Sequence, residues 1–174
     1  LLMDHFSVKH ALSTMSVLWD TREQDTPRAR KRMEQIGAPI ERVALSFGDY
    51  SVKCDTLDLR DQVAIERKMD LTELAHCYCQ DRKRFVREFK RAKEAGAKLY
   101  LLVENGSLDE AYSGHYRARV HPASLTASML AWLARYNCQI LFDRQFPLLS
   151  VEKYEASQQH IPNGYYGSIL PEKD

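Results

Sequence analysis

The residues best suited to chemistry are four carboxylates and one lysine, which follow or end short apolar or alternating segments. They are Asp20, Glu23, Asp49, Glu66 and Lys68. Strand ends are where α/β proteins usually build their sites. Carboxylates that lie close together repel one another in a cleft of low dielectric constant, so such a group is tolerated best around a cation. Because hard oxygen ligands favour Mg²⁺ or Mn²⁺ over zinc, the sequence indicates a site for one of these two metals.

Lys68 comes two residues after Glu66, and residues at i and i+2 of a strand point to the same face of a sheet. We therefore expect the ammonium and the carboxylate to enter one cleft. A metal held by the carboxylates could polarise a phosphodiester and lower the pKa of a bound water, while Lys68 orients that water or stabilises charge in the transition state. Arg67 lies between the two, is expected on the opposite face, and suits a structural ion pair.

The elements that must position these residues follow from periodicity and turn signals. Strands are expected at 16–20, 40–45, 50–54, 63–65, 97–104 and 139–142, and the second and third are expected to pair through a turn at 47–49. Helices are expected at 27–36, from about 72 to 95 with a break near 80–81, at 121–136, and around 151–157. This order predicts an α/β fold, an α/β/α sandwich with a central mixed sheet.

The helical segment from Arg82 to Lys93 carries seven Lys or Arg residues and one acid, Glu88, for a local charge of +6. A solvated helix face usually interleaves charges of both signs. Phosphate contact explains such a concentration better, and it would position DNA without reading its sequence. The candidate DNA-binding residues are Arg82, Lys83, Arg84, Arg87, Lys90 and Arg91.

Composition limits the classes of protein to which the chain can belong. Its 174 residues suit one domain, and 25 Lys and Arg residues nearly balance 24 Asp and Glu residues. No apolar run is longer than six residues, and the run at 99–103 has five, so all are too short for a membrane span. The four cysteines form no CxxC pair, which favours a reducing compartment, so we expect a cytoplasmic protein with no membrane partner. The net charge of +1 argues against nucleic acid only if charge is averaged over the chain.

Three motifs occur in order along the chain: Asp20-Thr21-Arg22-Glu23, Gly48-Asp49 and Glu66-Arg67-Lys68. They resemble the DxRE, GD and ERK motifs of the xeroderma pigmentosum group F (XPF) type nuclease domain, a branch of the restriction-endonuclease-like PD-(D/E)xK superfamily. The resemblance runs from about Ser16 to Phe142 and is nearest to compact bacterial or phage members. It implies a nuclease domain at 16–145, after an N-terminal extension at 1–15 and before a C-terminal helix or tail at 146–174.

The resemblance implies a Mg²⁺-dependent endonuclease, with Mn²⁺ as a substitute, that cuts DNA near branches, flaps or forks. Asp49 and Glu66 resemble the metal-binding carboxylates and Lys68 the catalytic lysine. Asp20 and Glu23 resemble a supporting acidic pair, and Asp20 is also expected to bind the metal. Arg22 and Arg67 would support the site.

The family pattern is ERKxxxD, and Thr72 stands here in place of the last Asp. If that carboxylate helps catalysis, activity would be reduced; if it only caps the following helix, the Thr72 hydroxyl can do the same, and this is the interpretation we favour. One alternative therefore stays open, a catalytically silent DNA-binding or scaffold subunit. A second alternative is an RNA-processing nuclease, because metal-bound carboxylates do not distinguish the sugars of DNA and RNA.

Many relatives also carry a C-terminal helix-hairpin-helix module, which is absent from this sequence. Substrate choice would then come from the nuclease domain, a dimer or a partner. Trp132 and Tyr136 suit either the core or a dimer face, and together with residues 146–166 they favour a homodimer.

Overall fold

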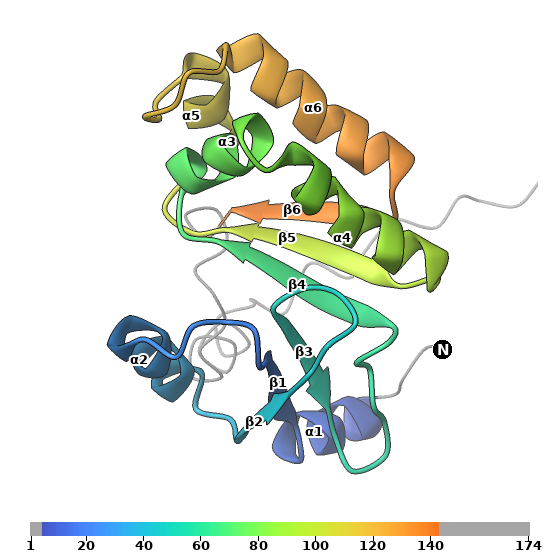
Figure 1. Ribbon diagram of the computed structural model, residues 1–174. Helices are drawn as coiled ribbons and strands as arrows, with labels where there is room; N and C mark the ends of the chain where they lie inside the picture. The colour runs from blue at the N-terminus through green and yellow to red at the C-terminus, as the bar shows by residue number, and fades with distance from the viewer. Residues whose placement is uncertain (1–4, 143–174) are drawn as a thin grey trace, which may run out of the picture.

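A six-stranded mixed sheet forms the centre of the protein, with strand order β2-β1-β3-β4-β5-β6 (Figure 1). The computed structural model describes residues 5–142. The strands are β1 (Ser16–Asp20), β2 (Ile40–Val43), β3 (Tyr50–Lys53), β4 (Val63–Lys68), β5 (Lys98–Val103) and β6 (Cys138–Phe142). The helices are α1 (His5–Ser13), α2 (Pro27–Ile36), α3 (Leu71–Cys79), α4 (Arg82–Glu94), α5 (Leu108–Ser113) and α6 (Pro122–Arg135).

Helices cover both faces of the sheet, as expected for an α/β/α sandwich. On one face α3, α4 and α6 pack on alternate residues of β5, and Leu99, Leu101 and Val103 are almost completely buried there. On the other face Ala29 and Met33 of α2 pack on β1. The fold class predicted from the order of elements is therefore confirmed. None of the described helices is long and apolar enough to cross a membrane.

The pairing of β2 with β3 that the turn at 47–49 suggested is wrong. β1 lies between them, parallel to β2 and antiparallel to β3. The physical reason is burial: residues 17–20 of β1 are buried on both faces and suit a central strand, whereas Ile40, Glu41 and Arg42 of β2 are exposed and suit an edge. The connection from β2 to β3 therefore crosses the end of β1.

Several helix boundaries follow the predicted signals. α2 begins at Pro27 and is followed by the left-handed Gly37, and the expected break between α3 and α4 falls at Gln80 and Asp81. α1 and α5 were not predicted, and α5 has only six residues, of which one, Ala111, is buried. The helix expected around 151–157 lies outside the described residues.

Trp132 belongs to the core and not to a dimer face. Its side chain is 4% exposed and packs against Phe85 and Phe89 of α4, with ring centroids 5.2 and 5.6 Å away. The second ring, Tyr136, is partly buried against the same cluster. A homodimer stays a prediction, and its expected contact at 146–174 lies outside the described residues.

Gly48 lets the turn before β3 pack directly on β4. Its φ is +70°, in the left-handed region. A Cβ at this position would lie 2.8 Å from Cβ of Ala64 and 3.1 Å from the carbonyl oxygen of Ile65. Only glycine therefore allows the neighbouring Asp49 to approach β4 this closely.

Gly48→Ala should destabilise the protein more than Gly37→Ala does. Gly37 has a similar φ of +72° but an added Cβ there meets nothing within 4 Å, so its substitution costs only the backbone strain of about 1–2 kcal/mol. At Gly48 a steric cost of about 1–3 kcal/mol adds to this strain. Chemical denaturation of the two variants measures the difference, and equal losses of stability would contradict the tight packing.

Candidate active site

Strand direction brings the three sequence motifs to one edge of the sheet. β1 and β4 are both antiparallel to β3, so their carboxyl ends lie on the same side as the start of β3. The DxRE motif follows β1, Asp49 directly precedes β3, and Glu66 and Lys68 end β4. Residues separated by up to 48 positions therefore meet.

An acidic cleft opens at this edge, and all five predicted catalytic residues line it. They are Asp20, Glu23, Asp49, Glu66 and Lys68, and Arg22 lines the same cleft. Other parts of the wall come from α3, from Asp81 and from α4. The clustering expected from the order of the motifs is thus seen in the structure.

Lys68 and Glu66 form a buried ion pair at the base of this cleft. Each residue is 7% exposed, and the Lys68 Nζ donates to Glu66 Oε1 at 2.7 Å. Burial opposes the charged form of Lys68, but the charges of Glu66 and Asp49 outweigh it and hold the lysine pKa above its usual value. With these carboxylates beside it, Lys68 is protonated and can stabilise negative charge.

The surroundings of Asp49 disfavour its charged form, whereas those of Lys68 favour the charged form of the lysine. Burial and the neighbouring Glu66 carboxylate raise its pKa well above the usual value, although the Lys68 charge and a hydrogen bond from the backbone N–H of Arg67 oppose this. That bond reaches Asp49 Oδ2 at 2.8 Å. Two carboxylates that repel each other in one cleft are an arrangement that a bound cation would relieve.

Asp20 is held inside the protein by its own motif. Its Oδ1 accepts from the backbone N–H and the Nε of Arg22, and its Oδ2 accepts from Arg22 Nη2 and from the backbone N–H of Leu45. Burial raises the pKa of Asp20, but these hydrogen bonds together lower it. With both oxygens engaged and 1% exposure, Asp20 supports the connection from β2 to β3, and its expected binding to the metal stays a prediction.

Arg67 points to the opposite face of β4, as alternation predicted. Its Nη2 donates to Glu104 Oε2 at 2.7 Å, and Arg32 of α2 binds the other oxygen of that carboxylate at 3.0 Å. Burial opposes the charge of Arg67, but Glu104 keeps the guanidinium pKa raised. The structural ion pair inferred for Arg67 is confirmed, and it joins β4 to α2.

The capping role favoured for Thr72 is wrong. Asp70 is the N-cap of α3: its side chain accepts from the backbone N–H of Glu73 at 2.8 Å. Thr72 already lies inside the helix, where its Oγ1 accepts from the backbone N–H of Arg117 at 3.1 Å. The sequence could not show this partner because it lies 45 residues away.

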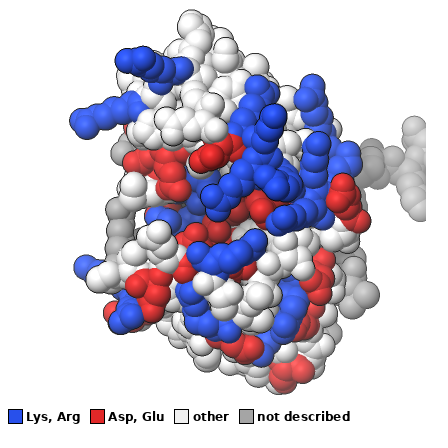
Figure 2. Space-filling view, in the orientation of Figure 1, with Lys and Arg blue, Asp and Glu red and all other residues white. Residues whose placement is uncertain are grey.

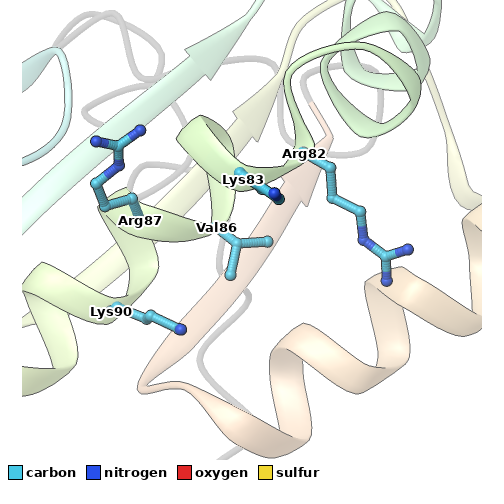
Figure 3. A pocket seen from close by; sticks show the side chains of 5 residues that line it. All are labelled: Arg82, Lys83, Val86, Arg87 and Lys90. Atoms are coloured by element: carbon cyan, nitrogen blue, oxygen red, sulfur yellow. The ribbon is translucent and has the colours of Figure 1, made fainter.

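The six predicted DNA-binding residues of α4 divide between two faces of the helix. Arg82, Lys83, Arg87 and Lys90 line a shallow hollow with Val86 on the outer face (Figure 3). Arg84 instead lines the acidic cleft, and Arg91 contacts Glu88 at 3.2 Å. Figure 2 shows basic side chains beside and across a group of acidic ones on this face of the protein.

Three carboxylates of the cleft, those of Glu73, Asp81 and Glu88, were not among the predicted site residues. Glu88 lines the cleft, and its Oε2 is buried with no hydrogen-bond partner among the described residues. The signal was present in the sequence, since Glu88 is the single acid among seven basic residues. Glu73 also lines the cleft, while its Oε2 accepts from the backbone N–H of Met69.

The donor set of the cleft fits Mg²⁺ or Mn²⁺. Asp49, Glu66 and the unpartnered oxygen of Glu88 are hard oxygen donors, and no cysteine or histidine cluster competes with them within residues 5–142. No three candidate ligands are gathered into a complete site within those residues. Mg²⁺ does not need one, because it commonly binds through one or two carboxylates together with water and substrate phosphates.

The ERCC4 domain family model matches residues 19–149. The chain belongs to the ERCC4 domain family. This family is the XPF-type nuclease family that the three motifs resemble, a family of nucleases that act on DNA. The match includes all three motifs and every strand from β2 to β6. No curated protein matches the chain.

Asp49→Asn should stabilise this ERCC4 domain in EDTA at pH 7. The pKa of Asp49 is higher in the folded state than in the unfolded state, so the ionised carboxylate lowers stability as pH rises. The gain should vanish as pH falls towards about 4, where the unfolded-state carboxyl becomes protonated. Denaturant unfolding across this range measures it.

Asp20→Asn is the matched control, and its expected change in stability has the opposite sign. Its lowered pKa means that the ionised form stabilises the fold above the unfolded-state pKa, so the variant should lose stability at pH 7. That loss should shrink as pH falls through the folded-state pKa. An Asp49→Asn protein less stable than the parent at pH 7 would contradict the electrostatic description of the cleft.

Proposed function

We propose that the protein is a Mg²⁺-dependent endonuclease that hydrolyses phosphodiester bonds in branched, flap or fork DNA, with Mn²⁺ as a substitute metal. The observation that supports it is the meeting of Asp49, Glu66 and Lys68 in one acidic cleft beside a basic helix. The preference for branched DNA comes from the resemblance of the three motifs to XPF-type domains.

The residues of the cleft have separate roles in this proposal. Asp49 and Glu66 hold the metal, which when bound polarises the scissile phosphate and lowers the pKa of the attacking water. Lys68 stays protonated and stabilises the negative charge that develops on the phosphate oxygens. The ion pair with Glu66 fixes the ammonium before the substrate arrives, so little reorganisation is needed during the reaction.

Hydrogen bonds from supporting residues fix the position of Asp49 in the cleft. Arg22 and Asp20 hold the backbone at Leu45, four residues before Asp49. The backbone N–H of Arg67 holds the Asp49 carboxylate itself. Glu23 lines the cleft and adds to the negative charge there.

Asp49→Asn and Glu66→Gln should each reduce cleavage of a labelled flap or fork in Mg²⁺ by about 10³-fold or more, because several kcal/mol of transition-state stabilisation depend on the metal. DNA binding in EDTA should be retained. Asp61→Asn is the control, since it removes an exposed carboxylate outside the cleft. Single-stranded, duplex, flap, fork and four-way DNA, with matched RNA, form the substrate panel.

The outcomes separate the proposal from its alternatives. If both variants cut like the parent, the assignment of Asp49 and Glu66 is wrong. If the parent binds junctions but does not cut with any divalent ion, the protein is a silent DNA-binding subunit. Preferential cleavage of the RNA strands would indicate an RNA-processing nuclease.

Replacing Lys83, Arg87 and Lys90 together by Gln should weaken DNA binding to all sequences alike. These residues line the outer hollow of α4, and loss of about three phosphate contacts should reduce the slope of log K against log salt by about 2.7. Fluorescence anisotropy in EDTA at several salt concentrations measures the slope. An unchanged slope would show that the outer face of α4 does not contact phosphates.

A further inference from the structure

Exposed and partly buried residues alternate in the loop between α5 and α6, although this loop is neither a helix nor a strand. From His115 to His121 every second residue is exposed: His115, Arg117, Arg119 and His121. The residues between them, Tyr116, Ala118 and Val120, are partly buried and pack against the main hydrophobic core. The loop therefore has an apolar inner side and an outer side whose side chains are all basic or imidazole.

Hydrogen bonds hold this loop against α3 and close it on itself. The backbone N–H of Arg117 donates to Thr72 Oγ1 at 3.1 Å, and the Cys79 thiol lies 3.9 Å from the carbonyl oxygen of Arg119. Within the loop, the Tyr116 hydroxyl donates to the carbonyl oxygen of Val120 at 3.2 Å. The outer side chains are consequently presented from an anchored backbone, which reduces the entropy lost when they bind a ligand.

The two arginines of this loop carry positive charge that no carboxylate within residues 5–142 neutralises. Arg117 and Arg119 are the only Lys or Arg residues between Lys98 and Arg135. Within residues 5–142 neither guanidinium forms an ion pair. Basic side chains project from this end of the protein in Figure 2, apart from the basic group around the acidic cleft.

α3 separates this loop from the acidic cleft and fixes the spacing between them. Glu73 and Cys77, one turn apart on α3, line the cleft, whereas Thr72 and Cys79 contact the loop from another side of the same helix. A helix is about 10 Å across, and one nucleotide spans about 3.4 Å along a strand. The loop therefore lies about three nucleotides beyond the wall of the cleft.

We propose that the outer side of the loop 115–121 is a second phosphate-binding surface, on which Arg117 and Arg119 hold an arm of the DNA substrate outside the cleft. The proposal rests on the proposed nuclease function and deepens it. DNA bound by both the outer face of α4 and this loop would be held at two places on either side of α3. Thr72, which stands in place of the family's Asp, becomes a positioning residue for this surface.

The test is the double substitution Arg117→Gln with Arg119→Gln, measured with fork DNA whose arms are shortened one at a time. Binding of the long-armed fork in EDTA at ~0.1 M salt should weaken at least about fivefold, and the salt slope should fall by about 1.8. The loss should disappear when the contacted arm is cut to about three nucleotides. The single-turnover cleavage rate at saturating enzyme should stay within about twofold, because neither arginine lines the cleft.

Lys9→Gln with Arg60→Gln is the charge-matched control. These residues lie on α1 and between β3 and β4, at the opposite end of the protein in Figure 1. The assignment of the loop is overturned if the Arg117 and Arg119 variant loses no affinity, or loses only as much as the control. In that case the parent still binds and cuts DNA, so the proposed function stands. A parent protein that binds no DNA overturns the proposed function together with this surface.

Thr72 provides an independent measurement. Thr72→Val removes the acceptor for the Arg117 N–H and should lower affinity for long-armed DNA in the same direction as the double variant. Thr72→Ser keeps the hydroxyl and should bind like the parent. If Thr72→Val binds like the parent while Thr72→Asp raises the cleavage rate, position 72 acts in catalysis and its role in positioning the loop is refuted.

Discussion

The site depends on the hydrogen bonds that tie Asp49 to its two neighbouring strands. Its carbonyl oxygen accepts from the backbone N–H of Asp20 at the end of β1, and its own N–H donates to the carbonyl oxygen of Ile65 in β4. Its side-chain carboxylate accepts a hydrogen bond from the backbone N–H of Arg67, two residues further along β4. Because Gly48 lets this turn lie directly on β4, three motifs that are distant in sequence meet at one point.

The packing of the Asp49 turn on β4 also determines how charge is distributed in the site. Burial and repulsion from Glu66 disfavour the charged form of Asp49, and Lys68 offsets them only in part, so the pKa of Asp49 stays raised. A cation bound between the two carboxylates would relieve this repulsion. The opposite behaviour of Asp20, whose hydrogen bonds from Arg22 and Leu45 lower its pKa, shows that each carboxylate is assigned its role by its immediate partners.

Charge is also divided on the scale of the whole domain, which is why a net charge of +1 is compatible with a DNA partner. The acidic residues of the cleft come from the ends of β1 and β4, the start of β3 and the inner sides of α3 and α4, whereas basic residues line the outer face of α4. A summed charge hides this separation, since phosphates interact with the nearest groups within about a Debye length. The distribution over the surface is therefore the informative quantity.

The sequence alone determined the features that depend on local periodicity and residue type. Alternation along β4 placed Glu66 and Lys68 on one face and Arg67 on the other, and helix start and stop signals placed α2 at 27–36 and the break between α3 and α4 near 80–81. Only the tertiary structure decided the long-range features: β1 separates β2 from β3, Asp20 is fully engaged by hydrogen bonds, and Thr72 holds a loop 45 residues away. The physical reason is that strand pairing and side-chain partnership join residues far apart in the chain, and these contacts are settled by burial and hydrogen-bond satisfaction in the whole fold.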